Sequence, residues 1–181
     1  MSIKYSSEEI DSWLKSIYPT FEKLKWHTDK VFHPLHIKHY SFFKEDIRYN
    51  AKINPTKIHG IQYAYQYNDP LHDPNKRIDW LDLLHNLKRL DSIIDGMKTR
   101  ESVVDHIHNC KESKVVLQFG NHYFTTAGQH RLCLAKFLEV SEVEVEIIKY
   151  KFDRSAFIEN KVKSIKSKKH SWLQKIFAAF R

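Results

Sequence analysis

The stretch YFTTAGQHRLCLAKFLEV, Tyr123–Val140, joins a strand-like run to a helix-like run through Gly128. The chain has only four glycines in 181 residues, and three side chains able to hydrogen-bond an anion follow this one. A glycine at a strand-to-helix junction lets a ligand approach the backbone, and the free N–H groups of the first helical turn carry partial positive charge. Phosphate is the usual ligand at such a place. The alternative is an ordinary turn whose arginine pairs with a nearby carboxylate.

The side chains around this glycine suit phosphate oxygens. His130 can donate a hydrogen bond, and Arg131 offers a planar fork of donors. Two threonine hydroxyls stand just before the turn. The predicted binding set is therefore Thr125, Thr126, Gly128, Gln129, His130 and Arg131.

A β-hairpin is predicted directly before this turn. KVVLQF and HYFTT flank the pair Gly120-Asn121, which is typical of a two-residue hairpin turn. After the turn, Leu132–Leu138 predicts a helix. VEVEIIKYKF then predicts a strand that ends near Phe152, because its valines alternate with glutamates.

Helices are predicted upstream of the hairpin. Asp79 can cap a leucine-rich helix, and Gly96 can close this helix or a second short one that begins near Asp91. Ser102–Asn109 predicts a further short helix. The order helix, hairpin, helix, strand therefore fills residues Ile78–Phe152.

The first part of the chain has weaker patterns. Ser7–Ile17 predicts a helix with a capping serine before it, and Pro34–Phe43 predicts a short helix within an aromatic, histidine-rich stretch. IHGIQYAYQY predicts a strand with an aromatic face at Tyr63–Tyr67, which we interpret as half-buried rather than base-stacking because basic residues are scarce there. The turn-rich loop Asn68–Lys76 marks an internal boundary.

The segment YFTTAGQHRLCLAKFLEVSEVEVEIIKY resembles the signature of the ParB/sulfiredoxin superfamily, in which a strand leads into a Gly-x-His-Arg or related turn, a helix and a final strand. Upstream, LLHNLKRLDSIIDG resembles the helical element that precedes the hairpin. The resemblance covers residues 78–152. It implies an α+β ParB/sulfiredoxin-like domain at residues 77–153, with a small mixed sheet flanked by helices. Residues 1–76 then form an N-terminal α/β extension packed on this core, and residues 154–181 a basic linker and a C-terminal amphipathic helix.

The resemblance also implies a ligand, ATP or CTP, bound with Mg²⁺. Its triphosphate would lie at Gly128–Arg131, where His130 and Arg131, as catalytic residues, would neutralise developing charge. Members of the superfamily act as CTP-switched DNA-partition clamps, ATP-using sulfinic-acid reductases, small-molecule kinases and nucleases. The expectation is thus a nucleotide-binding NTPase, phosphotransferase or nuclease acting with DNA, and the fold alone does not choose.

Departures from the family pattern narrow this expectation. Gln129 stands where sulfiredoxins carry a reactive cysteine, which disfavours reductase chemistry, and Cys133 is interpreted as a small buried helix residue. Ala127 stands where kinase-like relatives often carry an acidic residue. Residues 154–181 leave little room for the helix-turn-helix domain of the partition clamps. The carboxylates that could replace the missing one are Asp79, Asp82, Asp91, Asp95 and Glu101.

Charge and composition limit the classes of partner and compartment. Thirty Lys/Arg against 22 Asp/Glu give a formal charge of +8, which favours nucleic acid, nucleotides or an acidic membrane surface. The aromatic-rich 41% hydrophobic content indicates a folded chain. Two cysteines make no disulfide framework and no secretory signal is seen, so a cytoplasmic location is expected. A non-enzymatic nucleic-acid-binding or adaptor protein is the alternative function.

Twelve histidines raise the question of a metal site. Neither dense group follows a zinc-ligand pattern, and semi-buried hydrogen-bonding histidines are the favoured interpretation. The groups are His27 with His33, His36 and His39, and His106 with His108 and Cys110.

The end of the chain combines basic and apolar residues. Lys161–Lys169 predicts a flexible basic linker, and SWLQKIFAAFR predicts a short amphipathic helix. Such a segment fits an anionic surface, whether membrane headgroups, DNA or RNA, or the groove of an acidic protein. Docking of this helix on its own domain is an equal alternative.

Overall fold

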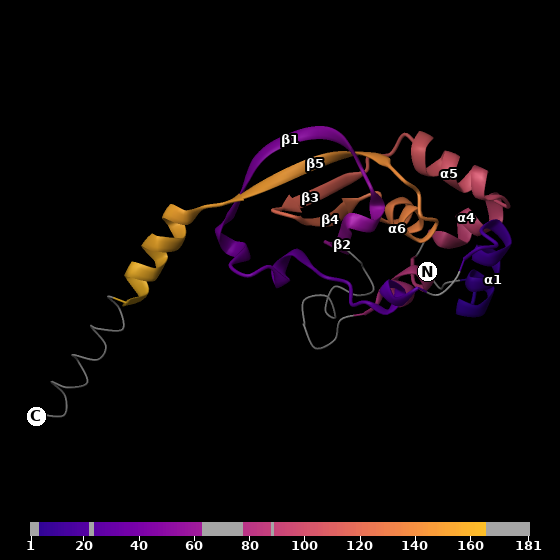
Figure 1. The fold of residues 1–181 in the computed structure, drawn as a ribbon, viewed down its shortest axis with the longest axis horizontal. Helices are drawn as coiled ribbons and strands as arrows, with labels where there is room; N and C mark the ends of the chain where they lie inside the picture. The colour runs from indigo at the N-terminus through magenta and orange to yellow at the C-terminus, as the bar shows by residue number, and fades with distance from the viewer. Residues whose placement is uncertain (1–3, 22–23, 63–77, 88, 166–181) are drawn as a thin grey trace, which may run out of the picture.

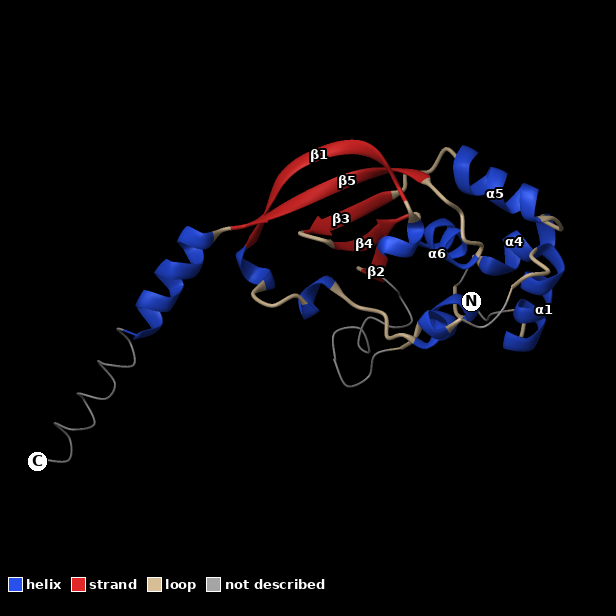
Figure 2. Cartoon of the chain, in the orientation of Figure 1, coloured by secondary structure: helices blue, strands red, loops and turns tan. Residues whose placement is uncertain are grey.

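A single five-stranded mixed sheet forms the centre of the molecule, with helices gathered at one end of it (Figures 1 and 2). The computed structural model describes residues 4–21, 24–62, 78–87 and 89–165. The strand order is β1-β5-β3-β4-β2. The pairs β1–β5 and β3–β4 are antiparallel, whereas β3–β5 and β2–β4 are parallel. The strands are β1 Phe43–Ile53, β2 Ile58–Ile61, β3 Val115–Phe119, β4 His122–Ala127 and β5 Val143–Phe152.

Helices flank this sheet, so the expected α+β class with a mixed sheet is confirmed. Across the described residues, no helix combines the length and apolar character needed to cross a bilayer. The α-helices are α1 Ser7–Ile17, α3 Trp80–His85, α4 Leu90–Gly96, α5 Arg100–Asn109 and α6 Gln129–Phe137, and residues 154–165 are also helical. The 3₁₀ helices are η1 Lys25–Thr28, η2 Pro34–His36, η3 Tyr40–Phe42 and η4 Pro55–Lys57.

Several elements form as the local sequence predicts. The Ser6 side chain accepts from the Glu9 N–H while the Glu9 carboxylate accepts from the Ser6 N–H, and this capping box starts α1. The hairpin β3–β4 turns at Gly120, and β5 buries its valines. These three predictions are confirmed because each depends on neighbouring residues alone.

Other predictions are wrong. Pro34–Phe43 is not one helix, since η2 and η3 are single turns and the chain then enters the eleven-residue strand β1, which was not predicted. β1 shows no alternation of burial because it is an edge strand exposed on both faces, so its conformation is set by pairing with β5. The expected linker is helical as far as Ile165. The predicted features at Tyr63–Tyr67, Asn68–Lys76 and SWLQKIFAAFR lie outside the described residues.

The leucine-rich run forms two helices rather than one. α3 ends at His85 and α4 begins at Leu90, close to the predicted second start. Their buried leucines and isoleucines pack in the larger core, together with α1, α5 and α6. Residues of the 1–76 segment complete the sheet, because β1 and β2 are its two edges.

The sheet has a core on each face. Val116 and Ile147 point to the larger core under the helices, whereas their neighbours point to the opposite face. There the segment around η2 and η3 covers a small cluster with Phe119 at its centre, whose ring stacks on Tyr150 at 4.5 Å between centroids. The buried members of this cluster are Leu117, Phe119, Phe124 and Ile148.

Packing of Phe119 in the small core predicts how much stability its removal costs. Phe119→Ala should lower the free energy of unfolding by about 3–5 kcal/mol, because a large buried ring leaves a cavity that the surrounding residues fill poorly. Urea denaturation measures this loss. Ile47→Ala on exposed β1 is the control and should change stability by only about 0.5 kcal/mol. A loss below about 1 kcal/mol for Phe119→Ala would show that the second face is not packed as described.

Candidate functional site

Gly128 begins α6 in the left-handed conformation, with φ 71° and ψ 26°. A side chain here would be strained, and a Cβ would meet Lys114 Cγ at 2.9 Å and the Ser113 carbonyl oxygen at 3.1 Å. The first helical hydrogen bond runs from the Leu132 N–H to the Gly128 carbonyl at 3.0 Å. The N–H groups of residues 129–131 therefore have no acceptor within the helix.

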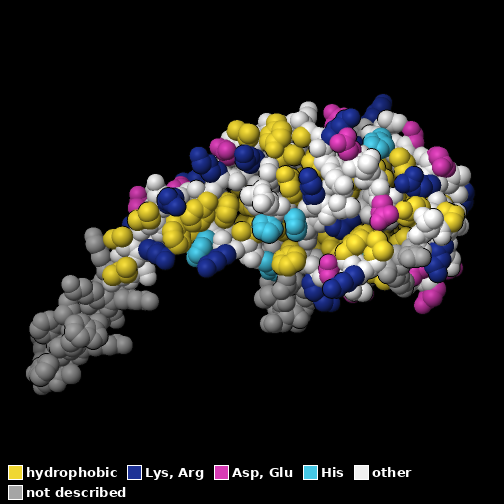
Figure 3. All heavy atoms as spheres, viewed as in Figure 1, with side chains coloured by type: hydrophobic (Ala, Val, Ile, Leu, Met, Phe, Trp, Pro, Cys, Tyr) yellow, Lys and Arg dark blue, Asp and Glu magenta, His cyan; other side chains and the backbone are white. Residues whose placement is uncertain are grey.

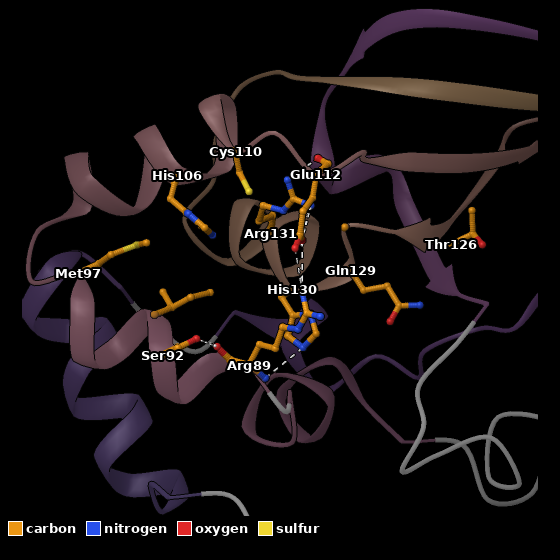
Figure 4. A pocket seen from close by; sticks show the side chains of 12 residues that line it. Arg89, Ser92, Met97, His106, Cys110, Glu112, Thr126, Gln129, His130 and Arg131 are labelled. Atoms are coloured by element: carbon orange, nitrogen blue, oxygen red, sulfur yellow. Dashed lines mark hydrogen bonds and ion pairs between the residues drawn. The ribbon is translucent and has the colours of Figure 1, made fainter. Parts of the chain in front are cut away.

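A pocket of about 600 Å³ opens at this helix start (Figure 4). Its volume lies within the usual range for small-molecule sites, roughly 300–1,000 Å³. Charged and polar groups form one part of its wall, and Ile93, Met97 and Cys110 supply apolar surface. The lining residues are Arg89, Ser92, Ile93, Met97, His106, Cys110, Glu112, Thr126, Gly128, Gln129, His130 and Arg131.

The Arg131 guanidinium is buried, and its donors are already bound to acceptors within the protein. Its residue is only 3% exposed, and Nη1 donates to the Glu112 carbonyl oxygen at 2.7 Å. Nη2 donates to the Ser113 carbonyl oxygen and to the Glu112 carboxylate, both at 3.3 Å. Phosphate could take the expected bidentate contact only by displacing these acceptors. The geometry therefore agrees with the interpretation in which this arginine pairs with a nearby carboxylate.

Lys114 anchors the same segment on its other side. Its ammonium donates to the Ile107 and His108 carbonyl oxygens, at 2.9 and 3.2 Å, which lie at the C-terminus of α5. Helix C-termini favour cations because their last carbonyls lack helical donors. Burial, followed by the charge of Arg131, lowers the pKa of Lys114. The chain from Glu112 to Lys114 is thus held between the end of α5 and the start of α6.

His130 is held in its neutral form. Its Nε2 accepts a hydrogen bond from the Arg89 N–H at 3.3 Å, which leaves the proton of the neutral ring on Nδ1. Burial lowers the pKa of His130 to about 4, and the charges of Arg89 and Arg131 act in the same direction. The side chain can donate to a ligand, but near neutral pH it brings no positive charge.

Arg89 and Glu112 form an exposed ion pair at the pocket, and no sequence pattern selected either residue. Arg89 Nη1 lies 3.2 Å from Glu112 Oε1, and both side chains are mostly exposed. Glu112 therefore stands between a buried guanidinium, Arg131, and an exposed one, Arg89. Arg89 is the exposed cation of the polar wall.

The two threonines of the predicted set lie apart. Consecutive strand residues face opposite sides of a sheet, so Thr126 lines the pocket whereas Thr125 is buried away from it. Gln129 lines the pocket, and its Nε2 is buried with no hydrogen-bond partner in the described part of the chain. Five of the six predicted binding residues are thus brought together.

None of the proposed replacement carboxylates reaches the pocket. Asp79 caps α3, and Asp91 and Asp95 accept hydrogen bonds from Lys4. Glu112 is the sole carboxylate among the described lining residues. The five candidates that do not line the pocket are Asp79, Asp82, Asp91, Asp95 and Glu101.

The histidine groups do not converge. Within residues 4–165, gaps aside, no three histidine, cysteine, aspartate or glutamate side chains are grouped to hold a metal ion. His27 is fully buried rather than semi-buried, its ring contacts Phe137 at 4.8 Å between centroids, and its Nδ1 accepts a hydrogen bond from the Leu24 N–H, so only the hydrogen-bonding part of the interpretation holds for it. Cys133 is buried as expected, and burial raises its pKa to about 12.

No family description, curated protein or solved structure matches the chain. The geometry of the site combines backbone donors that have no acceptor among the described residues, an exposed arginine, a neutral histidine and apolar wall residues. Such a combination suits an anionic head joined to an apolar or aromatic body.

The turn at Gly128 makes a second prediction. Gly128→Ala should lower the free energy of unfolding by more than about 2 kcal/mol, because left-handed strain of about 1–2 kcal/mol adds to the contact with Lys114 and Ser113. Gly120→Ala is the matched control, since φ is 60° but nothing lies within 4 Å. Thermal unfolding of both variants measures the difference. Equal losses would mean that the close packing at Gly128 is absent.

A third prediction concerns His130 and pH. Its folded pKa, about 4, lies below the ordinary 6.5, so between these values the unfolded chain binds the extra proton. Stability should therefore fall by up to about 3 kcal/mol as pH drops from 6.5 to 4. His130→Asn should lose this part of the slope. Denaturation across pH, with each protein referenced to its own value at pH 8, tests it, and identical slopes would contradict it.

Proposed function

We propose that the pocket at the start of α6 binds a nucleoside triphosphate, ATP or CTP, in a domain of the ParB/sulfiredoxin type. One observation carries the proposal: the N–H groups of residues 129–131, which have no acceptor among the described residues, and the exposed cation of Arg89 belong to residues that line the same pocket. Backbone donors at a helix start favour phosphate strongly. The sequence resemblance gives the same position independently.

At the phosphate end, Arg89 is the residue that would exchange partners. Arg89 pairs with the exposed Glu112 carboxylate, and a phosphate can replace this carboxylate as its partner without disturbing the fold. Arg131 keeps its carbonyl acceptors and acts through its charge. Neutral His130 would donate from Nδ1, and Gln129 Nε2, which lacks a partner among the described residues, would donate from beside the helix start.

At the other end, the wall suits a flat ring. Ile93 and Met97 supply apolar surface, and a methionine sulfur makes favourable contacts with aromatic rings. His106 lies on the same side, from α5, and burial lowers its pKa (Figure 4). A nucleotide whose base lies against this wall would place its phosphates on the opposite side of the pocket, at the start of α6.

The residues present also fit Mg²⁺ in part. Magnesium bound with a nucleotide is usually held by one or two carboxylates together with phosphates, and Glu112 is the described lining residue able to supply one. For phosphate transfer or hydrolysis, a proton acceptor is needed. His130 Nε2 is already engaged by the Arg89 N–H, which makes His106 the freer acceptor.

Cys110 gives a direct test of nucleotide binding. It is partly exposed and lines the pocket, whereas Cys133 is buried with a raised pKa, so alkylation of the folded protein should modify Cys110 alone. ATP or CTP with Mg²⁺ should slow this alkylation in a saturable way. Mass spectrometry of the labelled protein measures the rate. No protection by any nucleotide at millimolar concentration would overturn the proposal.

Arg89→Gln provides the matched variant. It should raise the nucleotide concentration needed for protection about tenfold, since a charge-assisted hydrogen bond is lost. Arg48→Gln removes another exposed, ion-paired arginine, which lies on β1 and does not line the pocket, and should leave protection unchanged. Equal behaviour of the two variants would contradict the role of Arg89.

A further inference from the structure

The helix of residues 154–165 carries an exposed apolar stripe. It leaves the end of β5 and runs away from the body of the molecule (Figure 1). Ile158, Val162 and Ile165 follow one another at helical spacing, and they are 53%, 43% and 66% exposed. An aliphatic stripe this exposed on a projecting helix calls for a partner surface.

The helix is firmly anchored at its base. The Asp153 carboxylate accepts from the Ala156 N–H at 2.9 Å and so caps the helix. The Phe157 ring lies 5.3 Å from that of Phe42 and 5.4 Å from that of Phe152, measured between centroids. The stripe is therefore presented at a defined place by aromatic packing.

Positive charge accompanies the stripe. Residues 154–181 contain eight Lys/Arg and one Glu, a net +7 of the chain's +8. On the described helix these are Arg154, Lys161 and Lys163 against Glu159, and Figure 3 shows basic and apolar side chains together on this projection. Most of the net charge of the chain is thus concentrated in the sequence of residues 154–181.

We propose that the helix of residues 154–165 docks on a membrane surface rich in anionic lipid headgroups. Lysines beside an aliphatic stripe match the anionic headgroups and the acyl boundary of such a surface. In the sequence, large apolar residues also follow Ile165, from Trp172 onward. Nucleic acid would engage the lysines but would leave the aliphatic side chains in water, so the membrane is favoured.

Sedimentation of the full chain with vesicles tests the proposal. Binding is expected to phosphatidylcholine vesicles that contain phosphatidylserine, and not to phosphatidylcholine alone. Replacement of Ile158, Val162 and Ile165 by Ser should reduce the bound fraction at least tenfold, roughly the effect of removing the apolar half of an interfacial helix. Leu35→Ser with Ile47→Ser, two exposed apolar residues of the body, is the control and should bind as the unchanged protein does.

Three results would overturn the proposal. One is no binding to the anionic vesicles, and another is undiminished binding of the triple-serine variant. The third is self-association through the stripe, seen as a dimer in analytical ultracentrifugation that the triple substitution dissolves. Salt-sensitive binding to duplex DNA that the triple substitution leaves intact, without vesicle binding, would assign the helix of residues 154–165 to nucleic acid instead.

Discussion

The buried guanidinium of Arg131 is the contact on which the candidate site depends. It ties the start of α6 to the carbonyls of Glu112 and Ser113, while Lys114 ties the same segment to the end of α5. Gly128 allows the close approach, because a side chain there would meet Lys114 and Ser113. Two helices and a hairpin are thereby fixed around one pocket, and the free N–H groups of α6 face a cavity instead of packed side chains.

This arrangement separates structural charge from charge available to a ligand. Arg131 has its hydrogen bonds satisfied within the protein, and its charge helps to keep His130 neutral. Arg89 holds the exposed carboxylate of Glu112 and can release it, since a surface ion pair contributes little to stability. An anion that enters the pocket can therefore replace Glu112 as the partner of Arg89, while the contacts of Arg131 and Lys114 stay unchanged.

The sequence predicted what depends on neighbouring residues and missed what depends on distant ones. Capping at Ser6, the turn at Gly120 and the alternation of β5 are local, and all were found. Strand β1 has charged residues on both exposed faces, so its sequence shows no alternation of apolar and polar residues. Its conformation depends on pairing with β5, about a hundred residues away along the chain. The same holds for the site. The glycine turn was visible in the sequence, but the roles of Arg131, Arg89 and Glu112 follow from contacts between separate segments.

Phosphate bound at the start of α6 would contact the backbone N–H groups of that turn, and amide NMR observes these groups directly. In a titration of the ¹⁵N-labelled protein with ATP or CTP and Mg²⁺, the N–H signals of Gln129, His130 and Arg131 should move most and saturably, with Arg89 following. Signals that stay unchanged at these positions, or that move only on the helix of residues 154–165, would contradict the account.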